Sequence, residues 1–256
     1  MQFTLTAVLL AVGLFVAMLA FLEIGRRIGE RRFRRDGEAA RTGTGVVEGA
    51  VFALLGLLLA FTFSGATSRF DERRKLIVEE ANAIGTAYLR LDLLPAAAQG
   101  EMRDRFRRYL DARLAIYRAL PNLDAVRADL AHANDLQQEI WTRALAESAG
   151  SQPATMLLLP ALNGMFDITT TRTAAAQTHP PPVVFALLFG FALLGALLAG
   201  TAMAGAKSRH WLHAATFAFA IAGAVYVILD MEYPRLGLIR IDAFDQVLVD
   251  LRQSMK

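Results

Sequence analysis

Long stretches without a charged side chain alternate with charge-rich stretches along this chain. The first charged residue is Glu23, no charge occurs between Glu48 and Arg69, and two further uncharged stretches lie after residue 181. A helix needs about 20 apolar residues to cross the roughly 30 Å hydrocarbon core of a bilayer. Four segments meet this requirement: residues 1–22, 49–68, 182–206 and 210–229. The pattern predicts an integral membrane protein with four transmembrane helices in two pairs.

Seven arginines lie between Glu23 and Thr44, directly after the first apolar segment. A cleaved signal peptide carries its positive charges before its apolar run, so we expect the first segment to be a retained anchor. We expect residues 23–44 to form an Arg-rich loop, completing a membrane region at 1–68. The arginines of such a loop either set the topology or bind lipid headgroups.

We expect the region between the two pairs of spans, residues 69–181, to form a helical extramembrane domain. Its fourteen basic and fourteen acidic residues make it water-exposed and nearly neutral. Because proline ends helices, Pro95 and Pro121 mark helix boundaries. We expect helices at 69–94 and 98–120, a third up to 149 and a fourth at 161–178, with an extramembrane segment at 230–256 after the spans at 182–229. The predicted fold class is therefore all-α.

No proline or polar loop separates the second span from the first helix of the domain, so we expect one continuous helix. Apolar residues recur along it every seven positions, at Phe63, Phe70, Ile77, Ile84 and Leu91. Such a seam packs against another helix. The pattern leaves open whether the partner helix belongs to the same chain or to a neighbouring subunit.

Small residues recur every four positions in three spans and predict close helix packing in the membrane. They are Gly56, Ala60 and Ser64; Ala192, Ala196, Gly200 and Ala204; and Ala214, Ala218 and Ala222.

The composition and the motifs limit the kinds of active site and ligand site that this chain can contain. The chain has 256 residues, 55% of them hydrophobic, no cysteine and a net charge of +3. Its arginines cluster beside a span, which favours the membrane over nucleic acid as their partner. We find no phosphate loop, nucleophile elbow, zincin pair or dinucleotide fingerprint, so we expect no enzyme and no cofactor. His210 and His213 share a helix face but lack a third ligand nearby, so we expect a polar pair and no metal.

Two charged segments have both a structural and a functional interpretation. The run from Arg69 to Lys75 is either a solvated collar where the helix leaves the membrane or a charged vestibule around a pore. The segment from Glu79 to Arg90 is either a helix interface with hydrogen bonds or a ligand site. Gly85 costs this helix about 1 kcal/mol relative to alanine, which favours a close packing contact there.

Several of these segments resemble the bestrophin-like membrane family of bacteria, long catalogued as a domain of unknown function. The resemblance lies in the stretch FTFSGATSRFDERR from Phe61 and in EANAIGTAYLR from Glu80. Two later blocks also fit: Leu162–Asn163 with Asp167 and Arg172, and DMEYPRLG from Asp230. It extends over about residues 47–241. The polar residues of these family motifs are Glu79, Glu80, Asn82, Tyr88, Arg90, Asn163, Asp167, Arg172, Asp230 and Pro234.

That family is in turn distantly similar to bestrophins, which are pentameric anion or cation channels with four spans per subunit. The resemblance implies a homo-oligomeric, pentameric ion channel with its pore along the second span. Its neck would consist of Ala53, Leu57 and Phe61, although alanine is too small to narrow a pore. A charged collar of Arg69, Glu72, Arg73 and Arg74 would follow. The alternative is a non-conducting membrane protein, an interaction or sensor protein whose domain binds a partner.

We expect a multi-pass protein of the bacterial inner membrane, in contact with the lipid bilayer and, as a channel, with inorganic ions. Four spans place both termini and the domain on one side. Basic residues in the short loops favour a periplasmic domain, whereas the bestrophin resemblance implies a cytoplasmic one. The count of nine basic residues in the short loops against seven near the other membrane faces mildly favours the periplasmic domain.

Overall fold

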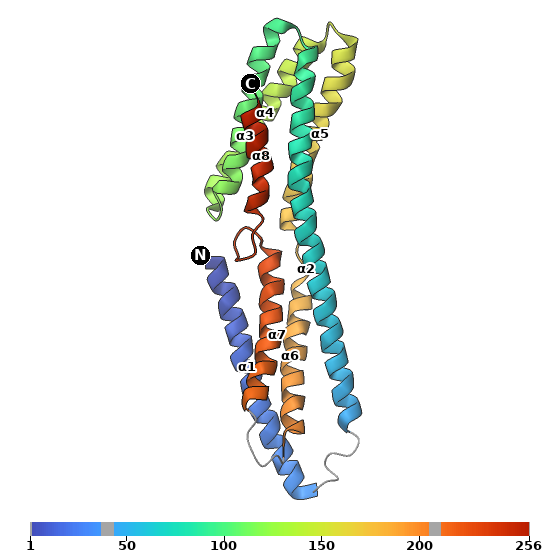
Figure 1. The fold of residues 1–256 in the computed structure, drawn as a ribbon, viewed down its shortest axis with the longest axis vertical. Coiled ribbons are helices and arrows are strands. Elements are labelled where there is room, and N and C mark those ends of the chain that lie inside the picture. The colour runs from blue at the N-terminus through green and yellow to red at the C-terminus, as the bar shows by residue number, and fades with distance from the viewer. Residues whose placement is uncertain (1, 37–43, 205–210, 256) are drawn as a thin grey trace. The chain divides into compact units, whose positions relative to one another are not determined.

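The computed structural model describes residues 2–36, 44–204 and 211–255, which contain helices and no strand (Figure 1). The elements are α1 (Gln2–Asp36), α2 (Thr44–Leu89), η2 (Arg90–Leu93), α3 (Ala96–Arg118), α4 (Leu123–Ser148), α5 (Gln152–Gln177), α6 (Pro182–Ala202), α7 (Trp211–Glu232), η3 (Asp242–Asp245) and α8 (Gln246–Ser254). The chain divides into two compact units. We call residues 1–68 and 179–238 the span unit, and residues 69–178 and 239–256 the charge-rich unit.

Four helical stretches are long and apolar enough to cross a membrane. They lie within Thr4–Arg35, Gly45–Leu93, Gln152–Ala202 and Trp211–Glu232. They overlap the four spans expected from the hydropathy pattern, and two of them extend far beyond the expected bounds because the apolar part continues into further helix. α7, for example, continues past residue 229 to Glu232. His210 of the expected histidine pair lies outside the described residues, whereas His213 is exposed on α7.

In the span unit, α1 packs against α6 and α7. The α1 and α6 backbones touch at two glycines. A Cβ atom on Gly200 would lie 2.0 Å from the carbonyl oxygen of Leu22, and one on Gly25 would lie 2.0 Å from the carbonyl oxygen of Leu197. The small-residue stripes of α6 and α7 are buried, as the sequence predicted. On α2, by contrast, Gly56 and Ala60 are exposed.

The expectation of a loop over residues 23–44 is wrong for residues 23–36, which continue α1. Ion pairs one turn apart support the helix there, as is usual for opposite charges at this spacing. Arg26 lies 2.7 Å from Glu23, Arg27 lies 2.9 Å from the same carboxylate, and Arg26 also pairs with Glu30. The rest of the expected loop, residues 37–43, lies outside the described residues.

The charge-rich unit encloses one hydrophobic core between α2, α3, α4, α5 and α8. Ile77 and Ile84 of α2 and Leu91 of η2 are fully buried in it, and Phe70 packs against it. The partner of this part of the seven-residue seam therefore belongs to the same chain. Phe63, at the other end of the seam, is 46% exposed and lies in the span unit.

Two boundaries differ from the expectation. α5 begins at Gln152, not near residue 161, because Ser151 caps its N-terminus by accepting a hydrogen bond from the Ala154 amide at 3.3 Å. Pro160 then lies inside the helix instead of before it. At the C-terminus, residues 239–256 belong to the charge-rich unit, where the unpredicted helix α8 buries Leu248 in the core.

Candidate functional site

One side of α2 stays exposed along most of the helix. Its residues are three or four positions apart, so a repeat of 3.6 residues per turn places them within an arc of about 100°. In the span unit they are Ala53, Leu57, Phe61, Ser64 and Ser68, and in the charge-rich unit Glu72, Lys75, Glu79, Asn82, Thr86 and Leu89. We call these residues the open face of α2.

The open face changes character along the helix. Leu57 and Phe61 are 51% and 67% exposed, so the part in the span unit carries large apolar side chains. Two hydroxyl residues follow, Ser64 and Ser68. Beyond them the face carries charged and amide side chains up to Asn82, then Thr86, and it ends at Leu89.

The opposite side of α2 is buried in both units. In the span unit it includes Leu55, Thr62 and Ala66. The hydroxyl of Thr62 donates to the carbonyl oxygen of Leu58 at 2.8 Å, so this polar group is satisfied within its own helix. In the charge-rich unit the buried side includes Ile77 and Ile84. α2 therefore has one packed side and one side that is largely exposed in both units.

The four residues predicted as a charged collar do not share one environment. Glu72 lies on the open face, and Arg69 is half-buried. Arg73 is buried and donates to the carbonyl oxygens of Ala175 at 3.1 Å and Thr178 at 2.8 Å. These are carbonyls at the C-terminal end of α5, which lack partners within their helix.

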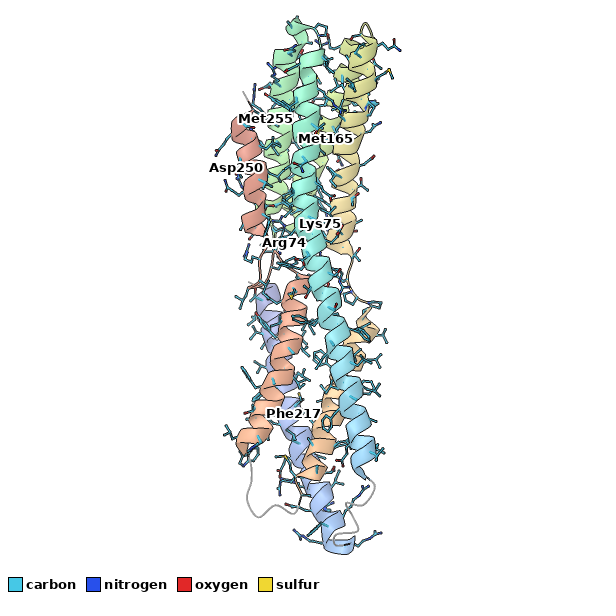
Figure 2. The ribbon with its side chains drawn as sticks, turned by 45° about the vertical axis from the view of Figure 1, so that its right-hand side comes forward. Arg74, Lys75, Met165, Phe217, Asp250 and Met255 are labelled. Atoms are coloured by element: carbon cyan, nitrogen blue, oxygen red, sulfur yellow. The ribbon has the colours of Figure 1, made fainter. Side chains whose placement is uncertain are left out.

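Arg74, the fourth of these residues, is directed toward the C-terminal segment of the chain. Its guanidinium lies 4.2 Å from the centre of the Phe244 ring and pairs with Asp71 at 3.0 Å. Figure 2 labels Arg74 beside Lys75 of the open face. A charge run that looks uniform in sequence is thus divided between packing contacts and exposed positions.

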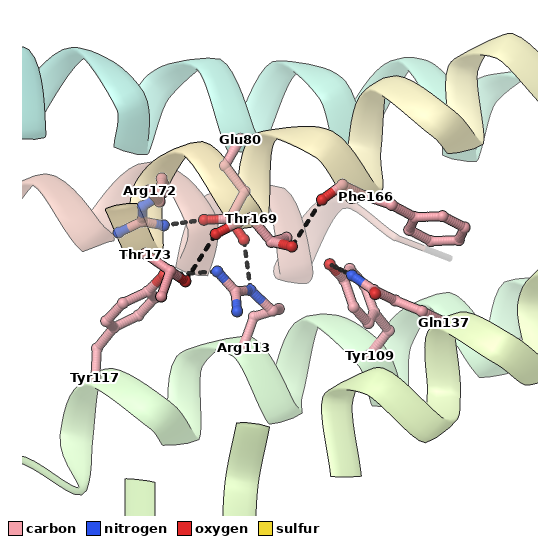
Figure 3. A network of polar contacts seen from close by, with 9 residues as sticks. All are labelled: Glu80, Tyr109, Arg113, Tyr117, Gln137, Phe166, Thr169, Arg172 and Thr173. Atoms are coloured by element: carbon pink, nitrogen blue, oxygen red, sulfur yellow. Dashed lines mark hydrogen bonds and ion pairs between the residues drawn. The ribbon is translucent and has the colours of Figure 1, made fainter. Parts of the chain in front are cut away.

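Glu80 is the centre of a buried polar cluster (Figure 3). Its carboxylate accepts a hydrogen bond from Arg113 Nε at 2.6 Å and another from Arg172 on the second oxygen. Arg113 also donates to the Tyr117 hydroxyl at 2.7 Å, and the Arg172 guanidinium lies 4.3 Å from the centre of the Tyr117 ring. The cluster joins α2, α3 and α5 from inside the core.

Sequence reasoning included Glu80 and Arg172 among the motif residues but missed Arg113 and Tyr117. A signal for Arg113 does exist. It lies three and four positions after Leu110 and Tyr109, on the buried side of α3. A charged residue at a core position of an amphipathic helix requires a buried partner, and Glu80 is the buried carboxylate that it meets.

Some of the other motif residues of the charge-rich unit make packing contacts or hydrogen bonds, and the others are exposed. Tyr88 is half-buried and packs edge-on against Phe106, with ring centres 6.0 Å apart. Arg90 donates to the carbonyl oxygen of Leu157 at 2.5 Å. Glu79 and Asn82 on α2, and Asn163 and Asp167 on α5, are exposed. The exposed four are the ones available to a ligand, an ion or a neighbouring chain.

The motif at the end of α7 closes a turn. The buried carboxylate of Asp230 accepts hydrogen bonds from the Leu238 amide at 3.0 and 2.9 Å, and Pro234 is buried within the turn. A Cβ atom on Gly237 would lie 2.1 Å from the same carboxylate. Glycine is therefore required where this turn passes Asp230. Among the described residues no group of three or more His, Cys, Asp or Glu side chains could hold a metal ion.

Comparisons with known proteins agree with this architecture. Crystal structures of a bacterial bestrophin homologue from Klebsiella pneumoniae align with 93–95% of this chain and 98–99% of theirs. A tyrosine-to-alanine variant has 16% identity and a TM-score of 0.67. A tryptophan-to-alanine variant has 17% identity and a TM-score of 0.68. A structure phased on zinc has 17% identity and a TM-score of 0.64. No curated protein matches the chain. Residues 7–243 match the Bestrophin-like domain, and the chain therefore belongs to the Bestrophin-like family.

Proposed function

We propose that this protein is a bestrophin-like ion channel of the bacterial inner membrane, a homopentamer that conducts along an axis lined by α2. The observation that carries the proposal is the open face of α2. It is apolar within the span, becomes polar at Ser64 and Ser68, and is charged at Glu72, Lys75 and Glu79. A pore needs this order, with an apolar constriction in the membrane and a hydrated, charged approach beyond it.

A single copy of α2 cannot enclose a pore, so the proposal requires an oligomer. Gly56 and Ala60 lie exposed on α2 beside the open face. Small residues let neighbouring backbones approach closely in a bilayer. With those positions in contact between copies, the open face would turn toward a common axis and the two serines would face water instead of lipid.

Leu57 and Phe61 are the residues that we assign to the neck. Both are large and more than half exposed, and rings of such side chains close a pore by excluding water. Ala53 lies on the same face, but its methyl group adds little to a constriction. The narrowest point is therefore expected at Leu57 and Phe61.

The charged vestibule of this proposal differs from the one expected from sequence. Arg73 supports α5 from inside the unit and is not available to ions. Arg74 is held by Phe244 and Asp71. Glu72 stays in the vestibule, and Lys75 and Glu79 of the open face replace the two arginines. The open face then carries two carboxylates and one ammonium group per chain, which favours cations near the axis.

The test is conduction by the purified full-length protein in planar bilayers, with its oligomeric state measured in mild detergent. Phe61→Ala and Leu57→Ala should each raise the conductance, because they widen the neck. Leu9→Ala is the matched control, since Leu9 is 61% exposed on α1, away from the proposed axis. A monomer, or a pentamer that passes no current with or without these substitutions, would contradict the channel. A silent pentamer would favour the alternative, a membrane protein whose charge-rich unit senses or binds a partner.

A further inference from the structure

The C-terminal end of α1 carries four arginines within five residues, Arg31, Arg32, Arg34 and Arg35, all of them exposed. Channel function gives them no role. The preceding turns are electrically balanced, because Arg26 and Arg27 pair with Glu23 and Glu30. No described carboxylate forms an ion pair with Arg31, Arg32 or Arg34. The positive charge of α1 is therefore concentrated in its last two turns.

This end of α1 is held firmly in place. A Cβ atom on Gly29 would lie 2.6 Å from the Ala204 side chain and 2.8 Å from the Thr201 carbonyl oxygen. Together with Gly25, this contact continues the α1–α6 packing past the apolar segment. The arginines thus project from a fixed helix.

The side of α1 that faces away from α6 carries apolar side chains up to the arginines. Ile24 and Ile28 are 47% and 38% exposed, and Ile28 is the last large hydrophobic residue exposed on α1. With 3.6 residues per turn, Arg31 and Arg35 continue the line of these isoleucines along the helix. Arg31 lies about 4.5 Å beyond Ile28 along the axis at 1.5 Å per residue. The headgroup layer is about 5–7 Å thick on each side of the hydrocarbon core.

We propose that this segment binds the phosphate headgroups of anionic phospholipids, with their acyl chains against Ile24 and Ile28. Arginine suits this role because its planar guanidinium donates two parallel hydrogen bonds to a phosphate. Glu23 and Glu30 do not compete for Arg31, Arg32 and Arg34, since Arg26 and Arg27 already neutralise them. The exposed isoleucines distinguish a lipid from a free phosphate ion, which would gain nothing from them.

The test compares the binding of dioleoyl-phosphatidylglycerol and dioleoyl-phosphatidylcholine to the purified full-length protein in detergent. Native mass spectrometry measures the lipid bound. Arg31, Arg32 and Arg34 are changed together to Gln. Each basic residue near anionic headgroups strengthens attraction by about fivefold at room temperature, so the triple variant should lose up to about 100-fold in phosphatidylglycerol affinity. Phosphatidylcholine binding should stay unchanged, and salt should weaken the wild-type preference.

A matched control removes three exposed arginines of the charge-rich unit, Arg108, Arg118 and Arg127, also by change to Gln. This control should bind phosphatidylglycerol like the wild type. Replacing Arg31, Arg32 and Arg34 by Lys should preserve most of the affinity, because the charge remains. The proposal fails if the Gln triple variant keeps the wild-type lipid preference, or if the control loses as much. Inorganic phosphate that displaces the lipid at equal concentration would also overturn it.

Discussion

Replacing Glu80 by Gln should destabilise the charge-rich unit by about 3–5 kcal/mol. The carboxylate is fully buried and is shared by Arg113 and Arg172. The amide of Gln keeps one acceptor oxygen but turns an NH₂ group toward one of the two guanidiniums. One charge-assisted hydrogen bond, worth about 1.5–3 kcal/mol, is then lost. Breaking a buried ion pair on one side costs about 3–5 kcal/mol in total, because the other charge remains buried.

The assay is thermal unfolding of the full-length protein in detergent, followed by circular dichroism. For a unit of about 130 residues, each kcal/mol corresponds to about 3–4 °C in Tm, so the expected loss is about 9–20 °C. Glu79→Gln makes the same chemical change one residue earlier, on the open face. Surface changes of this kind usually stay within about 0.5 kcal/mol. Equal melting temperatures for the two variants would refute the view that Glu80 holds the three helices together.

Two further substitutions test other contacts in the same assay. Gly200→Ala should lower Tm because its Cβ would lie 2.0 Å from the Leu22 carbonyl oxygen. Gly190→Ala is the control and should leave Tm unchanged, since its Cβ would have nothing within 4 Å. An unchanged Tm for Gly200→Ala would contradict the α1–α6 contact. The hydrogen bond from Arg105 lowers the pKa of Glu101 below its usual value of 4.5, so Glu101 contributes stability above that pH and loses it as the pH falls through the lowered pKa. Glu101→Gln should therefore be slightly less stable than the wild type at pH 7 and equal to it in acid; a difference that persists in acid would contradict this reasoning.

The four spans could be predicted because lipid imposes a simple rule on every residue of a span. A charge-free run of about 20 residues has few alternatives to a membrane helix. The continuity of α2 past Arg69 was predicted on similar grounds, since no proline or polar loop separates the second span from the helix that follows. Local rules of this kind need no knowledge of distant partners.

The extension of α1 to Asp36 was missed because part of its support comes from α6, in addition to the ion pairs within α1. Composition alone suggested a loop, since arginines and glycines are dense there. Gly25 and Gly29 lower helix propensity when considered by themselves. In the folded chain they are the positions where α6 approaches most closely, so the packing that they permit outweighs their intrinsic cost.

The roles of the charged residues depend on the partners that they meet. Arg73 and Arg74 are neighbours in sequence, yet one bonds the end of α5 and the other stacks on Phe244. The side of α2 on which each residue lies follows from the helical repeat. The partners that it contacts on that side belong to segments 100 or more residues away in the sequence. Sequence reasoning therefore treated the run as uniform.

The two sides of α2 allow stability and conduction to be perturbed separately. On the buried side, Arg73 bonds to Ala175 and Thr178, and Glu80 bonds to Arg113 and Arg172, all of them in the charge-rich unit. The open face should contribute little to the stability of a single chain, because its side chains are largely exposed. Changes such as Phe61→Ala should then alter the current and leave the unfolding temperature of the charge-rich unit unchanged. Glu80→Gln should lower that unfolding temperature and leave the current unchanged, as long as the current is measured below the temperature at which the variant unfolds. If both changes altered both properties equally, the open face would be part of the folding core and not the wall of a pore.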